Sequence, residues 1–256
     1  MDGFFFALSL TLFAGISTGL GSLIALFAKR KNTKFLACSL GFSAGVMLYV
    51  SMIEILAKAE EYLVKDVGAV TGEWFTAIFF FFGIILIGLI DFFIPSAEGD
   101  IGAKGDGNML ERMGIMTALA IAIHNFPEGL ATFTSALRDA HLGVAIAVAL
   151  AIHNIPEGIA TSLPIFYSTG NRKKAFAVSF LSGMTEPVGA VIGYLVLRPF
   201  FSDFVFGALF ATVAGIMVFI ALEELLPMAR ELEKSRITII GAMAGMMVMA
   251  VSLILL

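Results

Sequence analysis

Two copies of one polar motif bring metal-ligating residue types into apolar sequence. Residues 119–132 read LAIAIHNFPEGLAT, and residues 148–161, which begin 29 positions later, read VALAIHNIPEGIAT. Each copy holds a histidine, an asparagine and a glutamate, whose nitrogen and oxygen atoms suit a borderline divalent metal such as zinc, iron(II) or manganese. Polar and ionisable groups inside a membrane span are costly, so by default they mark a functional site.

Spacing within each copy predicts that the ligand types share one face of a helix. The histidine and the glutamate are four residues apart, and side chains at that spacing lie one above the other on a helix. The candidate metal ligands are His124, Asn125, Glu128, His153, Asn154 and Glu157. A further acid, Glu186, lies in the middle of another apolar run, and we predict that it completes the site because buried ions need partners.

A proline stands just before the glutamate in each copy. Pro127 and Pro156 lack an N–H group and should free the carbonyls of Ile123 and Ile152, four residues back. A freed carbonyl at membrane depth must find a partner or line a polar cavity. The motif is therefore predicted to loosen the helix where the ligands lie, and the glycine after each glutamate permits close backbone approach.

The charge of the candidate acids indicates one or two bound cations. Glu128, Glu157 and Glu186 carry three negative charges when ionised, which divalent cations would offset. Carboxylates that bridge two metals about 3.5–4 Å apart are a known arrangement. One ion would take His124, Glu128, His153 and Glu157; a second would take Asn125, Asn154, Glu186 and the shared Glu128 and Glu157.

Composition predicts an all-α integral membrane protein. Hydrophobic residues make up 59% of the 256 positions and charged residues only 14%, with a mean hydropathy of +0.97. Apolar runs of about 20 residues are long enough to cross a bilayer. We predict one transmembrane domain over 1–256 with a polar loop at 95–112 and eight spans, at 4–28, 35–57, 74–94, 113–135, 142–166, 175–197, 203–227 and 236–256.

The distribution of lysine and arginine predicts the orientation of these spans. One set of alternating loops carries twelve of these residues and the other set carries four. Because cytoplasmic loops carry the excess, the loop at 95–112 is predicted to be cytoplasmic. Both termini then lie outside the cytoplasmic membrane.

Two further repeats predict an inverted-repeat architecture. Residues 44–59 align with 214–229 at an offset of 170, and residues 14–25 align with 182–193 at an offset of 168. The predicted topology makes each pair run in opposite directions, which is typical of transporters with a midplane binding site. The expected arrangement is 3 + 2 + 3: spans 1–3 at 4–94, the motif helices at 113–166, and spans 6–8 at 175–256.

Four acids lie nearer the ends of the predicted spans. We interpret them as metal way-stations at the inner exit or the outer entrance, although acids near span ends often just face headgroups or water. They are Asp91, Glu223, Glu224 and Glu54.

These features resemble the ZIP family of metal transporters. The resemblance depends on HNFPEG at 124–129, HNIPEG at 153–158, Glu186 and LEELLP at 222–227. It implies eight helices in the 3 + 2 + 3 arrangement, a binuclear centre between helices 4 and 5, and import of zinc and other divalent ions into the cytoplasm. It implies the same two ligand sets as above. One departure is that many members have a His-rich loop between spans 3 and 4, whereas 95–112 contains no histidine.

The expected cargo is Zn²⁺, with Fe²⁺, Mn²⁺, Co²⁺ and Cd²⁺ fitting the same mixed ligands. We expect no prosthetic group, no enzyme activity and no nucleic-acid partner; the partners are metal ions, the bilayer and a second copy of the chain as a homodimer. Two alternatives stay open: a proton-coupled carrier of an organic solute, and an intramembrane metalloenzyme. The HExxH pattern of zinc proteases is absent, because each motif has one histidine.

Overall fold

The structure, a computed structural model, describes residues 2–27, 33–93, 107–200 and 202–255, and in these ranges the regular elements are all helices. The first half contains α1 (Asp2–Phe27), α2 (Thr33–Val50), the π-helix η1 (Ser51–Ile55), α3 (Leu56–Val67), α4 (Ala69–Phe93) and α5 (Gly107–Arg138). The second half contains α6 (Ala140–Thr169), α7 (Arg172–Gly183), α8 (Thr185–Leu197), the 3-10 turn η3 (Arg198–Phe200), α9 (Asp203–Ile220), the π-helix η4 (Ala221–Leu225), α10 (Leu226–Leu232) and α11 (Ile237–Leu255).

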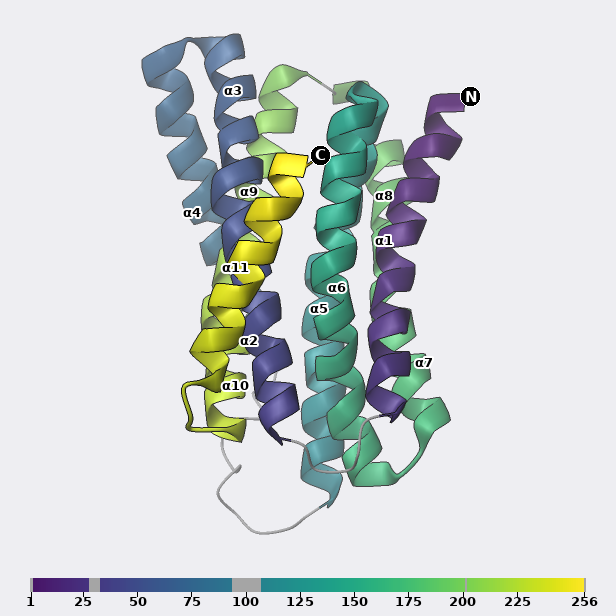
Figure 1. Cartoon of the computed structure of the whole chain (residues 1–256). Coiled ribbons are helices and arrows are strands. Elements are labelled where there is room, and N and C mark those ends of the chain that lie inside the picture. The colour runs from purple at the N-terminus through teal and green to yellow at the C-terminus, as the bar shows by residue number, and fades with distance from the viewer. Residues whose placement is uncertain (1, 28–32, 94–106, 201, 256) are drawn as a thin grey trace.

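Long apolar helices identify a protein that crosses a membrane several times. Within the described ranges, seven helical stretches are long and apolar enough: 3–27, 33–67, 69–90, 140–169, 172–196, 203–232 and 237–255. The predicted span at 113–135 lies in α5, which is not one of these seven, so the count of eight stays a prediction. Both termini lie at the same end of the bundle (Figure 1).

Two helices at one side of the bundle show the surface expected against lipid. On α4, Trp74 is 68% exposed and Phe81 is 59% exposed, and on α11 Met247 is 66% exposed. Apolar side chains exposed in such numbers mark a membrane or protein contact rather than a face toward water. The opposite pattern holds for α6, which is buried along most of its length.

Local sequence explains where the central helices begin and end. The Asp139 side chain caps α6 by accepting from the backbone N–H of His141 at 2.8 Å, and Asn171 caps α7 by accepting from Lys174 N–H at 3.0 Å. Between them α6 ends at Gly170, whose φ of 67° is the left-handed conformation that glycine adopts without strain. The tight 138–140 connection makes α5 and α6 antiparallel neighbours.

Two predicted boundaries were wrong, and one predicted span contains a break. The predicted span 175–197 agrees with the apolar stretch 172–196, but it consists of two helices that meet at Met184, because Pro187 in the first turn of α8 cannot supply the N–H group that a continuous helix needs. The helix that begins the predicted span 35–57 continues to Val67. The predicted loop 95–112 ends earlier, since 107–112 is already α5; residues 94–106 lie outside the described part of the chain.

The motif helices occupy the middle of the bundle (Figure 1). Helix α6 packs against α1, α5, α2 and α7, while α5 packs against α6, α8 and α1. At the flanks α2 packs against α11 and α4 packs against α9. Replacing each span by its repeat partner turns the pair α1–α6 into α8–α5 and the pair α2–α11 into α9–α4. All four pairs are in contact, so the helix packing follows the sequence repeat.

The two π-helices coincide with the sequence repeat. Residues 51–55 and 221–225 are separated by the offset of 170 that aligns 44–59 with 214–229. A π-turn inserts one extra residue into a helix, and such turns are often found at functional sites. The first turn contains Glu54 and the second contains Glu223 and Glu224, so three of the four predicted off-centre acids lie in these turns.

Candidate metal centre

The predicted ligands whose side chains are described lie in the interior of the protein. Asn125, His153, Asn154, Glu157 and Glu186 are 0% exposed and Glu128 is 1% exposed. Burying this many polar and ionisable groups is costly unless they have partners or bind ions. The placement therefore agrees with a functional site rather than with a lipid-facing or solvated stripe.

A histidine and a glutamate from different motif copies meet across the α5–α6 interface. Nε2 of His153 on α6 lies 3.5 Å from an Oε2 oxygen of Glu128 on α5. The sequence predicted the i, i+4 pairs within each copy, but this contact joins the two copies to each other. One imidazole and one carboxylate thus converge at the interface from opposite helices.

Both asparagines are held by backbone carbonyls of neighbouring helices. Asn154 Nδ2 donates to the carbonyl of Ala14 on α1 at 2.9 Å, and Asn125 Nδ2 donates to the carbonyl of Ser182 on α7 at 3.3 Å. A carbonyl oxygen only accepts, so these bonds fix each amide with its nitrogen toward the carbonyl. The two Oδ1 atoms are buried without a hydrogen-bond partner in the described ranges, and they are acceptors that suit a cation.

The Glu186 side chain contacts the second motif copy from α8. It lies in the first turn of α8, just after the break at Met184, and Asn154 Nδ2 donates to its Oε1 oxygen. Its other oxygen, Oε2, is buried and makes no hydrogen bond to a described residue. The Glu186 carboxylate thus lies next to Asn154 of the second motif copy, while its role in completing a metal site stays a prediction.

Glycines let these helices approach closely enough for such contacts. A Cβ atom at Gly129 would lie 2.0 Å from the Glu186 carbonyl oxygen, and one at Gly158 would lie 1.9 Å from the Thr18 carbonyl oxygen. No side chain fits at those distances. The predicted role of both motif glycines in close backbone approach is confirmed.

The expected loosening of the motif helices is not seen. Pro127 and Pro156 lie inside continuous helices, α5 and α6. Proline is tolerated in membrane helices where neighbours satisfy the backbone. Here the carbonyl next to the one that Pro156 frees, that of His153, accepts from Ser43 on α2 at 3.3 Å.

Of the remaining predicted site residues, some have side chains that the structure describes and others do not. The side chains of His124 and Asp91 lie outside the described part, although their residues belong to α5 and α4. Glu223 is exposed and Glu54 and Glu224 are half-buried, and all three belong to the π-helices rather than to the motif helices. Among described side chains, no group of three His, Cys, Asp or Glu is placed to hold a metal, so the binuclear grouping stays a prediction.

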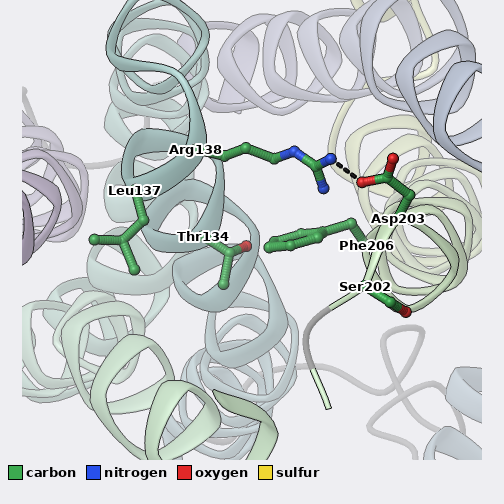
Figure 2. Close-up of a pocket in the computed structure, with 6 residues that line it drawn as sticks. All are labelled: Thr134, Leu137, Arg138, Ser202, Asp203 and Phe206. Carbon is green, nitrogen blue, oxygen red and sulfur yellow. Dashed lines mark hydrogen bonds and ion pairs between the residues drawn. The ribbon is translucent and has the colours of Figure 1, made fainter. Parts of the chain in front are cut away.

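A separate polar cluster near the end of the bundle was missed by the sequence analysis. Arg138 at the end of α5 pairs with Asp203 at the start of α9, beside a cavity of about 370 Å³ (Figure 2). The Arg138 guanidinium also lies 4.4 Å from the centre of the Tyr62 ring, and Lys65 pairs with Asp203 at 2.9 Å. Sequence separation conceals the cluster, because Arg138 and Asp203 are 65 positions apart.

Comparison with known proteins gives one consistent family. The family model described as ZIP zinc transporter matches residues 96–253. The zinc transporter ZupT of Lysinibacillus sphaericus is 56% identical over all of both chains, and that of Clostridium perfringens is 55% identical over 100% of this chain and 97% of its own. The ZupT protein of Streptococcus mutans is 55% identical over 98% of this chain and 97% of its own.

Proposed function

This chain belongs to the ZIP family of zinc transporters, and from that premise we propose that it imports Zn²⁺ across the cytoplasmic membrane through a binuclear site between α5, α6 and α8. It is a transporter and not an enzyme, as its family membership indicates. Fe²⁺, Mn²⁺, Co²⁺ and Cd²⁺ are proposed as further cargo, because the nitrogen and oxygen ligands suit them too.

One observation supports this proposal above the others: ligands from α5, α6 and α8 are linked to one another in a fully buried region. Glu128 meets His153, and Asn154 donates to Glu186. Glu157 lies one helical turn from His153 on α6 and is equally buried. We assign the first ion to His124, Glu128, His153 and Glu157, and the second to Asn125, Glu128, Asn154, Glu157 and Glu186.

We propose the eight-span, 3 + 2 + 3 inverted-repeat architecture for the whole chain. Support comes from the two π-helices, which are 170 positions apart, and from the helix pairs in contact, because replacing each helix by its repeat partner gives another pair that is also in contact. In this arrangement α5 supplies the fourth span, α7 and α8 together form the sixth, and both termini lie outside the cell.

The proposed transport cycle is alternating access. The motif helices move relative to the flanking repeat halves around the fixed site, as in other inverted-repeat transporters. Asp91, Glu223 and Glu224 are proposed as way-stations near the inner exit, and Glu54 near the outer entrance. Their half-buried or exposed positions, where described, suit brief contact with a partly hydrated ion.

Uptake of ⁶⁵Zn²⁺ into sealed vesicles tests the proposal. Glu157→Ala removes a ligand from both proposed ions, and we expect uptake to fall to the background of empty vesicles. The matched control is Glu60→Ala, which removes an exposed carboxylate from α3 and should leave uptake unchanged. Wild-type uptake by the Glu157 variant at equal protein level would refute the site, and uptake that requires an added organic solute would favour a solute carrier.

A further inference from the structure

Many buried hydroxyls on these helices follow a rule, and Thr18 is one of four in the described ranges that break it, together with Ser22, Thr161 and Thr238. Hydroxyls in membrane helices commonly donate to the carbonyl four residues earlier. On α1, Thr11 Oγ1 donates to Ala7 O at 2.9 Å and Ser17 Oγ donates to Phe13 O at 2.9 Å. Thr18 is 0% exposed, yet its Oγ1 has no hydrogen-bond partner among the described residues.

The carbonyl that would usually accept the Thr18 hydroxyl accepts a ligand of the candidate metal centre instead. The carbonyl four residues before it belongs to Ala14, and that oxygen accepts the Asn154 amide at 2.9 Å. The same α1 turn therefore holds one ligand in position and leaves a buried hydroxyl without its normal bond.

The Thr18 side chain packs against the residue that follows the one holding Asn125. A Cβ atom at Gly183 would lie 2.7 Å from both Cβ and Oγ1 of Thr18, so the threonine packs against the end of α7. The preceding residue, Ser182, accepts the Asn125 amide at 3.3 Å. Thr18 and Asn125 thus contact adjacent residues at the end of α7, Gly183 and Ser182, from α1 and α5.

The internal repeat identifies Thr18 as the counterpart of Glu186. The offset of 168 relates Ala14 to Ser182 and Thr18 to Glu186, and the two asparagines donate to the first related pair. The close approaches of the motif glycines repeat the same relation, since Gly158 faces the Thr18 carbonyl as Gly129 faces that of Glu186. Thr18 therefore occupies the Glu186 position in the other half of the site.

We propose that Thr18 is a specificity-determining residue of the transport site, an inference that rests on the proposed function. On the α1 side, the Thr18 hydroxyl and Asn125 Oδ1 would present two neutral oxygens to the cation. On the α8 side, Asn154 would present a neutral amide oxygen and Glu186 a charged carboxylate. Manganese(II) prefers oxygen ligands, whereas zinc is satisfied by few ligands that include imidazole. The added oxygen therefore favours Mn²⁺ more than Zn²⁺.

The test compares Mn²⁺ and Zn²⁺ in vesicle uptake and in binding to the purified protein, with Mn²⁺ binding followed by its electron paramagnetic resonance. Thr18→Val keeps the shape and removes the hydroxyl, and we expect Mn²⁺ affinity and uptake to fall about tenfold while Zn²⁺ changes less than about twofold. Thr18→Ser restores the hydroxyl and should restore Mn²⁺. Thr11→Val is the matched control, because it removes an equally buried α1 hydroxyl that is bonded within its own helix.

Two results would overturn the assignment of Thr18. One is Thr18→Val with wild-type Mn²⁺ and Zn²⁺ values; the other is an equal loss for both metals that serine does not restore, which is the mark of a structural role. Failure of the proposed function has a different signature, since Glu157→Ala would then retain Zn²⁺ uptake whatever the Thr18 variants do.

Discussion

The interface of α6 with α1 and the interface of α5 with α7 and α8 have the same backbone contacts and different chemistry. In each, an asparagine on the motif helix donates to a carbonyl of the flanking helix, and a motif glycine lies against the backbone one turn further on. The flanking positions then differ, with Thr18 on α1 and Glu186 on α8. Backbone contacts preserve the two-fold relation, whereas the side chains place the negative charge on one side only.

Helix continuity differs between the same two regions. Helix α1 runs without interruption through Thr18 and Gly19, while its counterpart breaks into α7 and α8. The residue equivalent to Gly19 at the offset of 168 is Pro187, which cannot donate a backbone hydrogen bond. The break thus accompanies the carboxylate, so the half that carries the charge is also the half whose flanking helix is interrupted.

The largest effect is expected from adding a side chain where each interface brings a motif glycine against a backbone carbonyl. Gly129→Val and Gly158→Val each add atoms where a backbone carbonyl lies about 2 Å away, so neither helix pair can close. We expect each to lose about 3 kcal/mol or more of stability and to give little folded protein, measured by thermal unfolding in detergent. Gly3→Ala is the control, since its Cβ would meet its nearest neighbour at 3.9 Å. A folded, stable variant in one half only would contradict the two-fold relation.

Making the two halves chemically alike gives the next largest effect. Glu186→Thr places the Thr18 residue type on both sides and removes one carboxylate from the proposed second ion. We expect Zn²⁺ uptake to fall at least about tenfold without being abolished, because the ligands of the first ion remain. Metal stoichiometry of the purified protein checks this, with two ions for the wild type and one for the variant. Loss of all bound metal would contradict the division into two ions.

The smallest effect is expected at the end of the bundle, where an ion pair in one half has no charged counterpart in the other. Arg138 and Asp203 correspond by the repeat offsets to Tyr167 and Thr33. Because Arg138 and Asp203 are only partly buried and Lys65 also pairs with Asp203, Arg138→Ala should cost about 1 kcal/mol. Lys65→Ala, which removes a mostly exposed side chain, should cost less in the same thermal unfolding assay. A larger loss of stability for Lys65→Ala would show that Arg138 is not the more important partner of Asp203.

Much of the fold followed from apolar run lengths and turn residues. A segment that crosses a membrane must satisfy its backbone hydrogen bonds internally, so a long apolar run such as 203–227 predicts a helix. The break at Met184 and the π-helices were not predicted. Apolar periodicity contains no signal for one extra residue in a turn, and a proline inside a span does not always interrupt it, since Pro127 and Pro156 leave α5 and α6 continuous.

At the candidate site, the sequence predicted residues but not their partners. The doubled HNxPEG motif and Glu186 indicated ligands through residue type, spacing and burial. The carbonyls of Ala14 and Ser182 have no side-chain signature, and Thr18 resembles any other threonine in a span. Their roles depend on contacts between residues far apart in the chain, as with Asn154 and Ala14, which are 140 positions apart.

By itself the sequence determined that this is a helical membrane protein with nitrogen and oxygen ligands repeated in two neighbouring helices, because hydrophobicity, spacing and residue type are local properties. Only the tertiary structure decided which atoms face each other. Asparagine amides turn toward particular carbonyls, Glu128 meets His153, and Thr18 loses its own helix acceptor because helices from distant segments approach through glycines and compete for the same backbone groups.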